Sequence, residues 1–192
     1  MSPTFVIVLR AASLLAFAAP LLLTVGGRRR SLDRRPGHGH GDRMPLRANL
    51  TAFALFFPSL LAFRGTLEGH AALLLALTGC LLAVAGAALV LRSRMELGSA
   101  WSFVPMADQT TGLVTTGPYR LVRHPIYLGL SMLGMGEALA FASWPAFFVV
   151  LAGIVPTFLW RSSAEEKLLT ATFGERYACY RKDAKMIIPR LL

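Results

Sequence analysis

The chain has 192 residues, of which 55% are hydrophobic and 16% are charged, and its mean hydropathy is +0.55. An ordinary soluble domain of this length is less apolar, because polar side chains have to cover its surface, so the composition favours a membrane protein. The net charge of +10 would suit a nucleic-acid-binding protein, but the sequence has no base-stacking or groove-reading module, which disfavours that class.

Five apolar segments predict an all-α integral membrane protein with about five transmembrane helices. The first and third segments are long enough to cross about 30 Å of hydrocarbon as helices, whereas the other three are shorter. A removable signal peptide is the alternative for the first segment, but that segment has neither a basic start nor an obvious cleavage site. The five segments cover residues 5–25, 48–63, 71–91, 126–143 and 145–160.

The chain is interpreted as one membrane domain over residues 1–192, with N-terminal helices in 1–94 and the functional motifs in 95–192. The turn at Trp144 and Pro145 predicts that the last two apolar segments form an antiparallel hairpin, with Trp144 at the membrane surface. Cys80 lies in an apolar segment and Cys179 in the basic tail, so both are expected to be free thiols.

The stretch from 26 to 43 is rich in Gly, Arg and His and predicts a flexible linker that can contact anionic headgroups. Within it, His38, His40 and Asp42 are metal-ligating residue types. A glycine-rich loop lacks the ordered groups that usually support such ligands, so no metal site is predicted.

The segment from Gly117 to Gly129, GPYRLVRHPIYLG, places polar, aromatic and helix-breaking residues directly before an apolar segment. Prolines follow Gly117 and His124 and push both residues toward extended conformations, so continuous helix is not expected between them. Pro125 suits the first position of a helix, which predicts a helix starting at His124-Pro125 and running through Tyr127. His124 then lies where unpaired N–H groups favour an anion such as a carboxylate. The alternative is an interfacial histidine that only caps the helix.

Arg161 and Glu165 are four residues apart and share a helix face if the last apolar helix continues past them. Ser162 and Ser163 each stand three residues before a glutamate, which also fits a capping box at a new helix start. Two interpretations therefore stay open for Glu165 and Glu166: a helix cap, or carboxylates that hold a polar ligand at the membrane edge.

The tail after Glu166 predicts an amphipathic helix with a break at Gly174. It is interpreted as a lid over a site, and a plain interfacial helix is the alternative. The apolar residues that recur at helical spacing are Leu168, Leu169, Phe173, Tyr177 and Tyr180.

Glu137 is the one acid inside an apolar segment, which makes it a functional candidate by default. It lies near the outer end of that segment, so snorkelling to the outer headgroups is the favoured explanation.

The GPYRLVRHPIYLG segment, Arg161-Ser-Ser-Ala-Glu-Glu166 and Phe173-Gly-Glu-Arg-Tyr177 with Tyr180 together resemble the isoprenylcysteine carboxyl methyltransferase family and its phospholipid N-methyltransferase relatives. The resemblance covers about Leu97 to Pro189. It implies a membrane enzyme that binds S-adenosylmethionine (SAM) on the cytosolic side and methylates a carboxylate or thiol of a lipophilic or small substrate. The sequence has no GxGxxG turn, so SAM would be held without a Rossmann domain.

The same resemblance implies roles for individual residues. His124, Arg161 and Glu165 would be catalytic, and Trp101 and Arg161 would contact the substrate. The cofactor-binding residues would be Gly117, Tyr119, Arg120, Leu121, Val122, Arg123, His124, Pro125, Tyr127, Glu165 and Glu166.

Three alternatives remain. A phosphatidylethanolamine N-methyltransferase would share every motif. An NADPH-dependent sterol reductase is less favoured, because such enzymes resemble an Arg-His-x-Asn-Tyr pattern where this chain has Arg-His-Pro-Ile-Tyr. A non-enzymatic membrane partner protein would leave the Gly117 to Tyr127 cluster unexplained. The expected partners are the bilayer and the methyl acceptor, with no nucleic acid or metal. The Ala-, Leu- and Arg-rich composition indicates a bacterial inner membrane as the location.

Charge distribution gives a testable topology. All of the 20 Lys and Arg residues except Arg10 and Arg64 fall within 28–47, 92–123 or 161–190, which five spans would place on one side. The positive-inside rule makes that side cytosolic, so a reporter fused after Leu192 should be cytosolic and one fused before Met1 external. Finding both reporters on the same side would contradict the five-span arrangement.

Overall fold

The computed structural model describes residues 3–31, 44–63, 65, 69–98 and 112–187. Within these ranges the regular structure is helical apart from one isolated bridge, which confirms the all-α prediction. Two helices are long and apolar enough to cross a bilayer, Gly69–Leu97 and Trp144–Phe173. The count of five spans stays a prediction.

The described residues form seven α-helices. Each of the first four predicted apolar segments falls largely within one helix, and the fifth covers α5, the turn after it and the start of α6. Their bounds are α1 Pro3–Ser31, α2 Met44–Ala62, α3 Gly69–Leu97, α4 Pro125–Ala140, α5 Trp144–Val149, α6 Val155–Phe173 and α7 Glu175–Asp183. Helix α1 continues to Ser31, so the predicted linker is wrong for residues 26–31. The rest of that linker, with His38, His40 and Asp42, lies outside the described residues.

Helices α5 and α6 form one rod, because a π turn, η3 (Val150–Ile154), joins them without a break. The N–H of Val155 donates to the carbonyl of Val150, one residue wider than in an α-helix. Pro156 follows at once and has no N–H to give to the preceding turn, which favours a local departure from α geometry. The rod extends to Phe173, beyond residue 160, where the predicted apolar segment ends.

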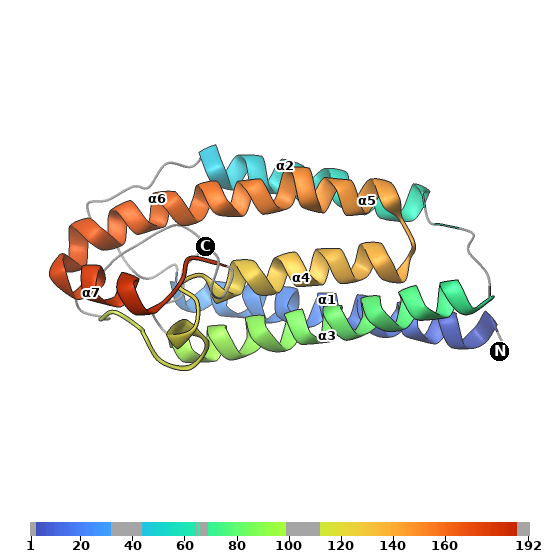
Figure 1. Cartoon of the computed structure of the whole chain (residues 1–192), viewed down its shortest axis with the longest axis horizontal. Helices are drawn as coiled ribbons and strands as arrows, with labels where there is room; N and C mark the ends of the chain where they lie inside the picture. Colours follow the sequence, from blue (N-terminus) through green and yellow to red (C-terminus); the bar gives the residue numbers. More distant parts are fainter. Residues whose placement is uncertain (1–2, 32–43, 64, 66–68, 99–111, 188–192) are drawn as a thin grey trace.

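Helix α4 lies between two groups of helices (Figure 1). On one side, glycines of α3 and α4 bring the two backbones into direct contact. A Cβ atom on Gly79 would lie 2.4 Å from the backbone nitrogen of Ala140, and one on Gly136 would lie 2.6 Å from the carbonyl oxygen of Gly79. Small residues at such positions are the usual way in which membrane helices approach closely without a hydrophobic driving force.

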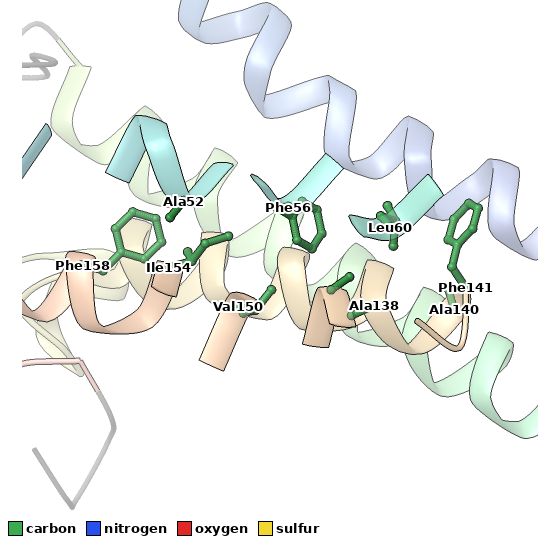
Figure 2. Close-up of a cluster of buried hydrophobic side chains, with 10 residues drawn as sticks. Ala52, Phe56, Leu60, Ala138, Ala140, Phe141, Val150, Ile154 and Phe158 are labelled. Atoms are coloured by element: carbon green, nitrogen blue, oxygen red, sulfur yellow. The ribbon is translucent and has the colours of Figure 1, made fainter. Parts of the chain in front are cut away.

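On its other side, α4 packs with α2 and the α5–α6 rod around a cluster of large and small apolar side chains (Figure 2). Phe56 and Leu60 of α2 are fully buried there. The turn from α4 to α5 closes this side, since the Ser143 hydroxyl donates to the carbonyl of Ser59 over 3.1 Å. The predicted break and antiparallel hairpin at Trp144 are confirmed. The labelled members of the cluster are Ala52, Phe56, Leu60, Ala138, Ala140, Phe141, Val150, Ile154 and Phe158.

Glu137 does not snorkel, which corrects the sequence prediction. Its side chain is 1% exposed and accepts a hydrogen bond of 3.1 Å from the Ser13 hydroxyl of α1. Arg10, one turn earlier on α1, donates to the carbonyl of Ala140 over 3.0 Å. These polar contacts join α1 to α4 at the end of the bundle where α4 ends.

The glycine contact predicts a sharp difference between two alanine substitutions. In Gly136→Ala, the new methyl would lie 2.6 Å from backbone atoms of α3, so the helices have to separate, at a cost of about 1 to 3 kcal/mol. Gly153→Ala is the matched control, because its methyl would lie 3.6 Å from the Ala52 side chain. The free energies of unfolding of both variants should be measured in one detergent, and equal values would contradict the packing.

Candidate functional site

The site lies where the segment before α4, the end of α6 and the start of α7 meet. The segment from Gly117 forms a short 3-10 turn, η2 (Gly117–Arg120), and then runs extended into α4. His124 is the N-cap of α4 and Pro125 its first residue, as predicted. The His124 side chain is 6% exposed, so its chemistry is set by neighbouring side chains.

Glu165 and Glu166 lie well inside α6, because the helix continues to Phe173. The capping-box interpretation is therefore wrong, and the prediction that Arg161 and Glu165 share one helix face is confirmed. Gly174 ends the helix with a φ of +51°, a conformation that glycine adopts readily, and the chain reverses into α7. The predicted break at Gly174 is thereby confirmed.

Glu165 is held by three side chains. The Tyr127 hydroxyl donates to its Oε1 atom. The Nε atom of Arg161 lies 3.4 Å from the same oxygen, and Nδ1 of His124 lies 3.5 Å from Oε2. Thus α4 and α6 meet through one partly buried carboxylate.

Glu166 has a different set of partners. The Nε and Nη2 atoms of Arg123 both lie 2.7 Å from its Oε1 atom. Nε2 of His124 lies 3.5 Å from the same oxygen, and Nε of Arg181 lies 3.7 Å from Oε2. His124 therefore bridges the two carboxylates, one ring nitrogen toward each.

These carboxylates control the charge of His124. Burial alone would lower the pKa of the imidazole, but Glu165 and Glu166 outweigh burial and raise it above the ordinary histidine value. The two carboxylates thus favour the protonated form of His124, which lies beside the permanent cations Arg123 and Arg161.

Three buried polar atoms near this cluster make no hydrogen bond within the part of the chain that is described: Nε2 of His124, Oγ of Ser162 and Oη of Tyr177. The 3.5 Å contact of Nε2 with Glu166 is an ion-pair distance rather than a hydrogen bond. Buried polar groups are normally satisfied, so these atoms fit a site that receives a polar ligand.

An aromatic stack continues from the cluster into the apolar bundle. The rings of His124 and Tyr127 stack at 5.7 Å, and those of Tyr127 and Phe158 at 4.9 Å. The guanidinium carbon of Arg161 lies 5.6 Å from the centre of the Tyr127 ring. The polar cluster therefore packs directly against the apolar core between the helices.

The remaining predicted residues are not all gathered here. Gly117 packs against Glu96 at the end of α3, where a Cβ atom would lie 2.8 Å from the carboxylate. Arg120 and Leu121 are exposed, whereas Val122 is 2% exposed and pairs with Lys185 in the isolated bridge. Trp101, the predicted substrate contact, lies outside the described residues.

The tail contributes contacts that the sequence did not reveal. The Tyr180 hydroxyl donates to the carbonyl of Tyr119 over 2.6 Å. Burial raises the pKa of Tyr180 to about 12, so the phenol keeps the proton that it donates. The backbone nitrogens of Arg123 and His124 donate to the carbonyls of Lys185 and Met186. Only the amphipathic pattern of the tail hinted at these contacts, because backbone hydrogen bonds leave no side-chain signature.

Comparisons with known proteins agree with this arrangement. The model of a family described as phospholipid methyltransferase matches residues 74–176. A protein-S-isoprenylcysteine O-methyltransferase of Schizosaccharomyces pombe is 32% identical over 97 residues, which cover 50% of this chain and 41% of that protein. The protein of the same name from Mus musculus is 32% identical over 118 residues, or 60% of this chain and 41% of its own length.

Among solved structures, that of the eukaryotic intramembrane Ras methyltransferase ICMT (isoprenylcysteine carboxyl methyltransferase) without a monobody is similar in fold. The TM-score is 0.53 at 20% identity, over 81% of this chain and 54% of that one. The fold is shared, while this chain spans less than half the length of either curated relative.

The bridging histidine predicts a pH dependence of stability. The native pKa of His124 is raised, so native protein holds this proton more tightly than unfolded protein does. The resulting stabilisation should be complete below about pH 6.5, the ordinary histidine pKa, and be lost as pH rises through the native pKa. The free energy of unfolding of the wild type should exceed that of His124→Gln, and this difference should shrink as pH rises from about 6.5 through the native pKa of His124. His70→Gln, at an exposed position in the first turn of α3, is the control. An advantage that does not change with pH would contradict a cationic His124.

Proposed function

Because the chain belongs to the phospholipid methyltransferase family, we propose that it is a membrane methyltransferase of the isoprenylcysteine carboxyl methyltransferase type. The methyl donor is SAM, and the acceptor is a carboxylate or thiol on a lipophilic or small molecule. The active site is the cluster of His124, Tyr127, Arg161 and Glu165 at the cytosolic end of the bundle.

The observation that carries this proposal is the cluster of cations packed against the apolar core. Arg123, Arg161 and Arg181 supply three permanent positive charges around the two carboxylates, and protonation of His124 adds to this excess. Such a site attracts an anionic acceptor, and the Tyr127–Phe158 stack supports one with an apolar tail. Arg161 is assigned to the acceptor carboxylate, because a planar guanidinium binds carboxylates in a fixed orientation.

The polar residues also fit SAM. Bound SAM supplies an electrophilic methyl group on a sulfonium, which an in-line nucleophile displaces. The carboxylate of Glu165 suits the ammonium or ribose hydroxyls of the donor, and Nε2 of His124 and the Tyr177 hydroxyl are buried without hydrogen-bond partners. The role of the protein is to orient both reactants and exclude water, which lowers the barrier without a strong base.

A phospholipid N-methyltransferase is the second candidate, favoured by the family description. Methylating an ammonium headgroup requires a group that removes its proton. Two carboxylates favour the protonated form of His124, and a protonated imidazole cannot accept that proton. The geometry therefore favours an acceptor that is already an anion.

Direct titration tests the proposal. Purified protein should bind SAM and not NADPH, and methyl transfer should be found with prenylcysteine analogues or small thiols rather than phosphatidylethanolamine. Binding of NADPH alone would instead support the reductase alternative.

His124→Ala should lose at least tenfold in methyl transfer, about 1.4 kcal/mol, while its helix content is retained. A folded His124→Ala that keeps more than about half of the activity would return His124 to a capping role.

A further inference from the structure

Arg123 lies beside the proposed reaction site and joins three parts of the chain. Its Nε and Nη2 atoms contact Glu166 of α6 at 2.7 Å. Its Nη1 atom donates to the carbonyl of Ala184 and lies 3.4 Å from that of Arg181. The side chain is 9% exposed, so these contacts replace water around a buried charge.

The two carbonyls belong to the C-terminal strap, defined here as α7 (Glu175–Asp183) with residues 184–187. The strap also pairs with the start of α4 through the backbone. The N–H of Arg123 donates to Lys185 over 2.7 Å, and that of His124 donates to Met186 over 3.0 Å. One residue, Arg123, thus uses both its backbone and its side chain to hold the strap.

We propose that Arg123 is a positioning residue that latches the C-terminal strap onto α6 and thereby fixes His124. The inference rests on the proposed function only for its kinetic consequence. His124 follows Arg123 directly, and its own N–H is bound to the strap. Release of the strap therefore frees the backbone that sets the direction of the imidazole.

This assignment separates the two adjacent glutamates. Both side-chain contacts from Arg123 converge on one oxygen of Glu166, which makes Glu166 part of the latch. Glu165 contacts Tyr127 and Arg161 instead and lies on the reaction side. The family resemblance had implied that Glu165, Glu166 and Arg123 all contact the cofactor.

Lysine cannot replace this arginine. An ammonium is a compact charge on a flexible stem, whereas the guanidinium offers five donors in a fixed fork. Arg123→Lys can keep the ion pair with Glu166, but it cannot bind Glu166 and the Ala184 carbonyl with the same geometry. The matched control is Arg120→Gln, which removes the same charge from an exposed position three residues earlier.

Hydrogen exchange of the full chain in nanodiscs, without ligand, tests the latch. In Arg123→Gln, amides in peptides that cover 121–124 and 184–187 should exchange at least tenfold faster, while α3 peptides keep the wild-type rate. Arg123→Lys should lie between the two, and Arg120→Gln should match the wild type. Should Arg123→Gln fail to fold, Glu166→Gln breaks the same contact and should show the same pattern. Wild-type exchange of the strap in a folded Arg123→Gln or Glu166→Gln would overturn the latch.

Kinetics then separate positioning from simple support of the fold. Arg123→Gln should raise the KM for SAM about tenfold and lower kcat by less than about threefold, because enzyme that has bound SAM can still transfer the methyl group. Adding Glu166→Gln should cause little further change, since both variants break one contact. A fall in kcat with an unchanged KM would contradict positioning. If the wild type transfers no methyl group, the proposed function fails, yet the exchange experiment still decides the latch.

Discussion

Two adjacent carboxylates at the end of an apolar helix bundle set the main constraint on this fold. Charges taken out of water are stable only when opposite charges and hydrogen bonds surround them. Arg161, one partner of these glutamates, lies on α6 itself. The other partners come from the start of α4 and from α7, which the chain has to bring next to α6. The break before Pro125 and the reversal at Gly174 both serve this convergence.

The same constraint gives the site its chemical character. A cluster that neutralised its carboxylates one for one would offer little to an anion. Here Arg123, Arg161 and Arg181 already outnumber the two carboxylates, and His124 contacts both of them. An acceptor carboxylate would complete the balance of charge inside the site. That is why the geometry supports transfer to an anion more than transfer to an ammonium.

Local features of the site could be predicted, but contacts between distant segments could not. Pro125 fixed the start of α4 because proline is tolerated at few helical positions. The same rules left Glu165 and Glu166 open, since a capping box and a continuing helix share one pattern. The burial of Glu137 was missed, because its partner Ser13 lies 124 residues away and carries no signal of its own. The contacts of Arg123 with the carbonyls of Arg181 and Ala184 could not be predicted, because every residue possesses a backbone carbonyl.

The polar contacts between α1 and α4 have a consequence for how the bundle forms in a bilayer. Helix α1 precedes α4 in the chain, yet it carries Arg10 and Ser13, whose partners Ala140 and Glu137 belong to α4. Until α4 arrives, an arginine facing lipid disfavours insertion of α1 by a few kcal/mol. Helix α1 therefore cannot settle fully before α4 is present, and its place in the membrane depends on a partner synthesised more than a hundred residues later.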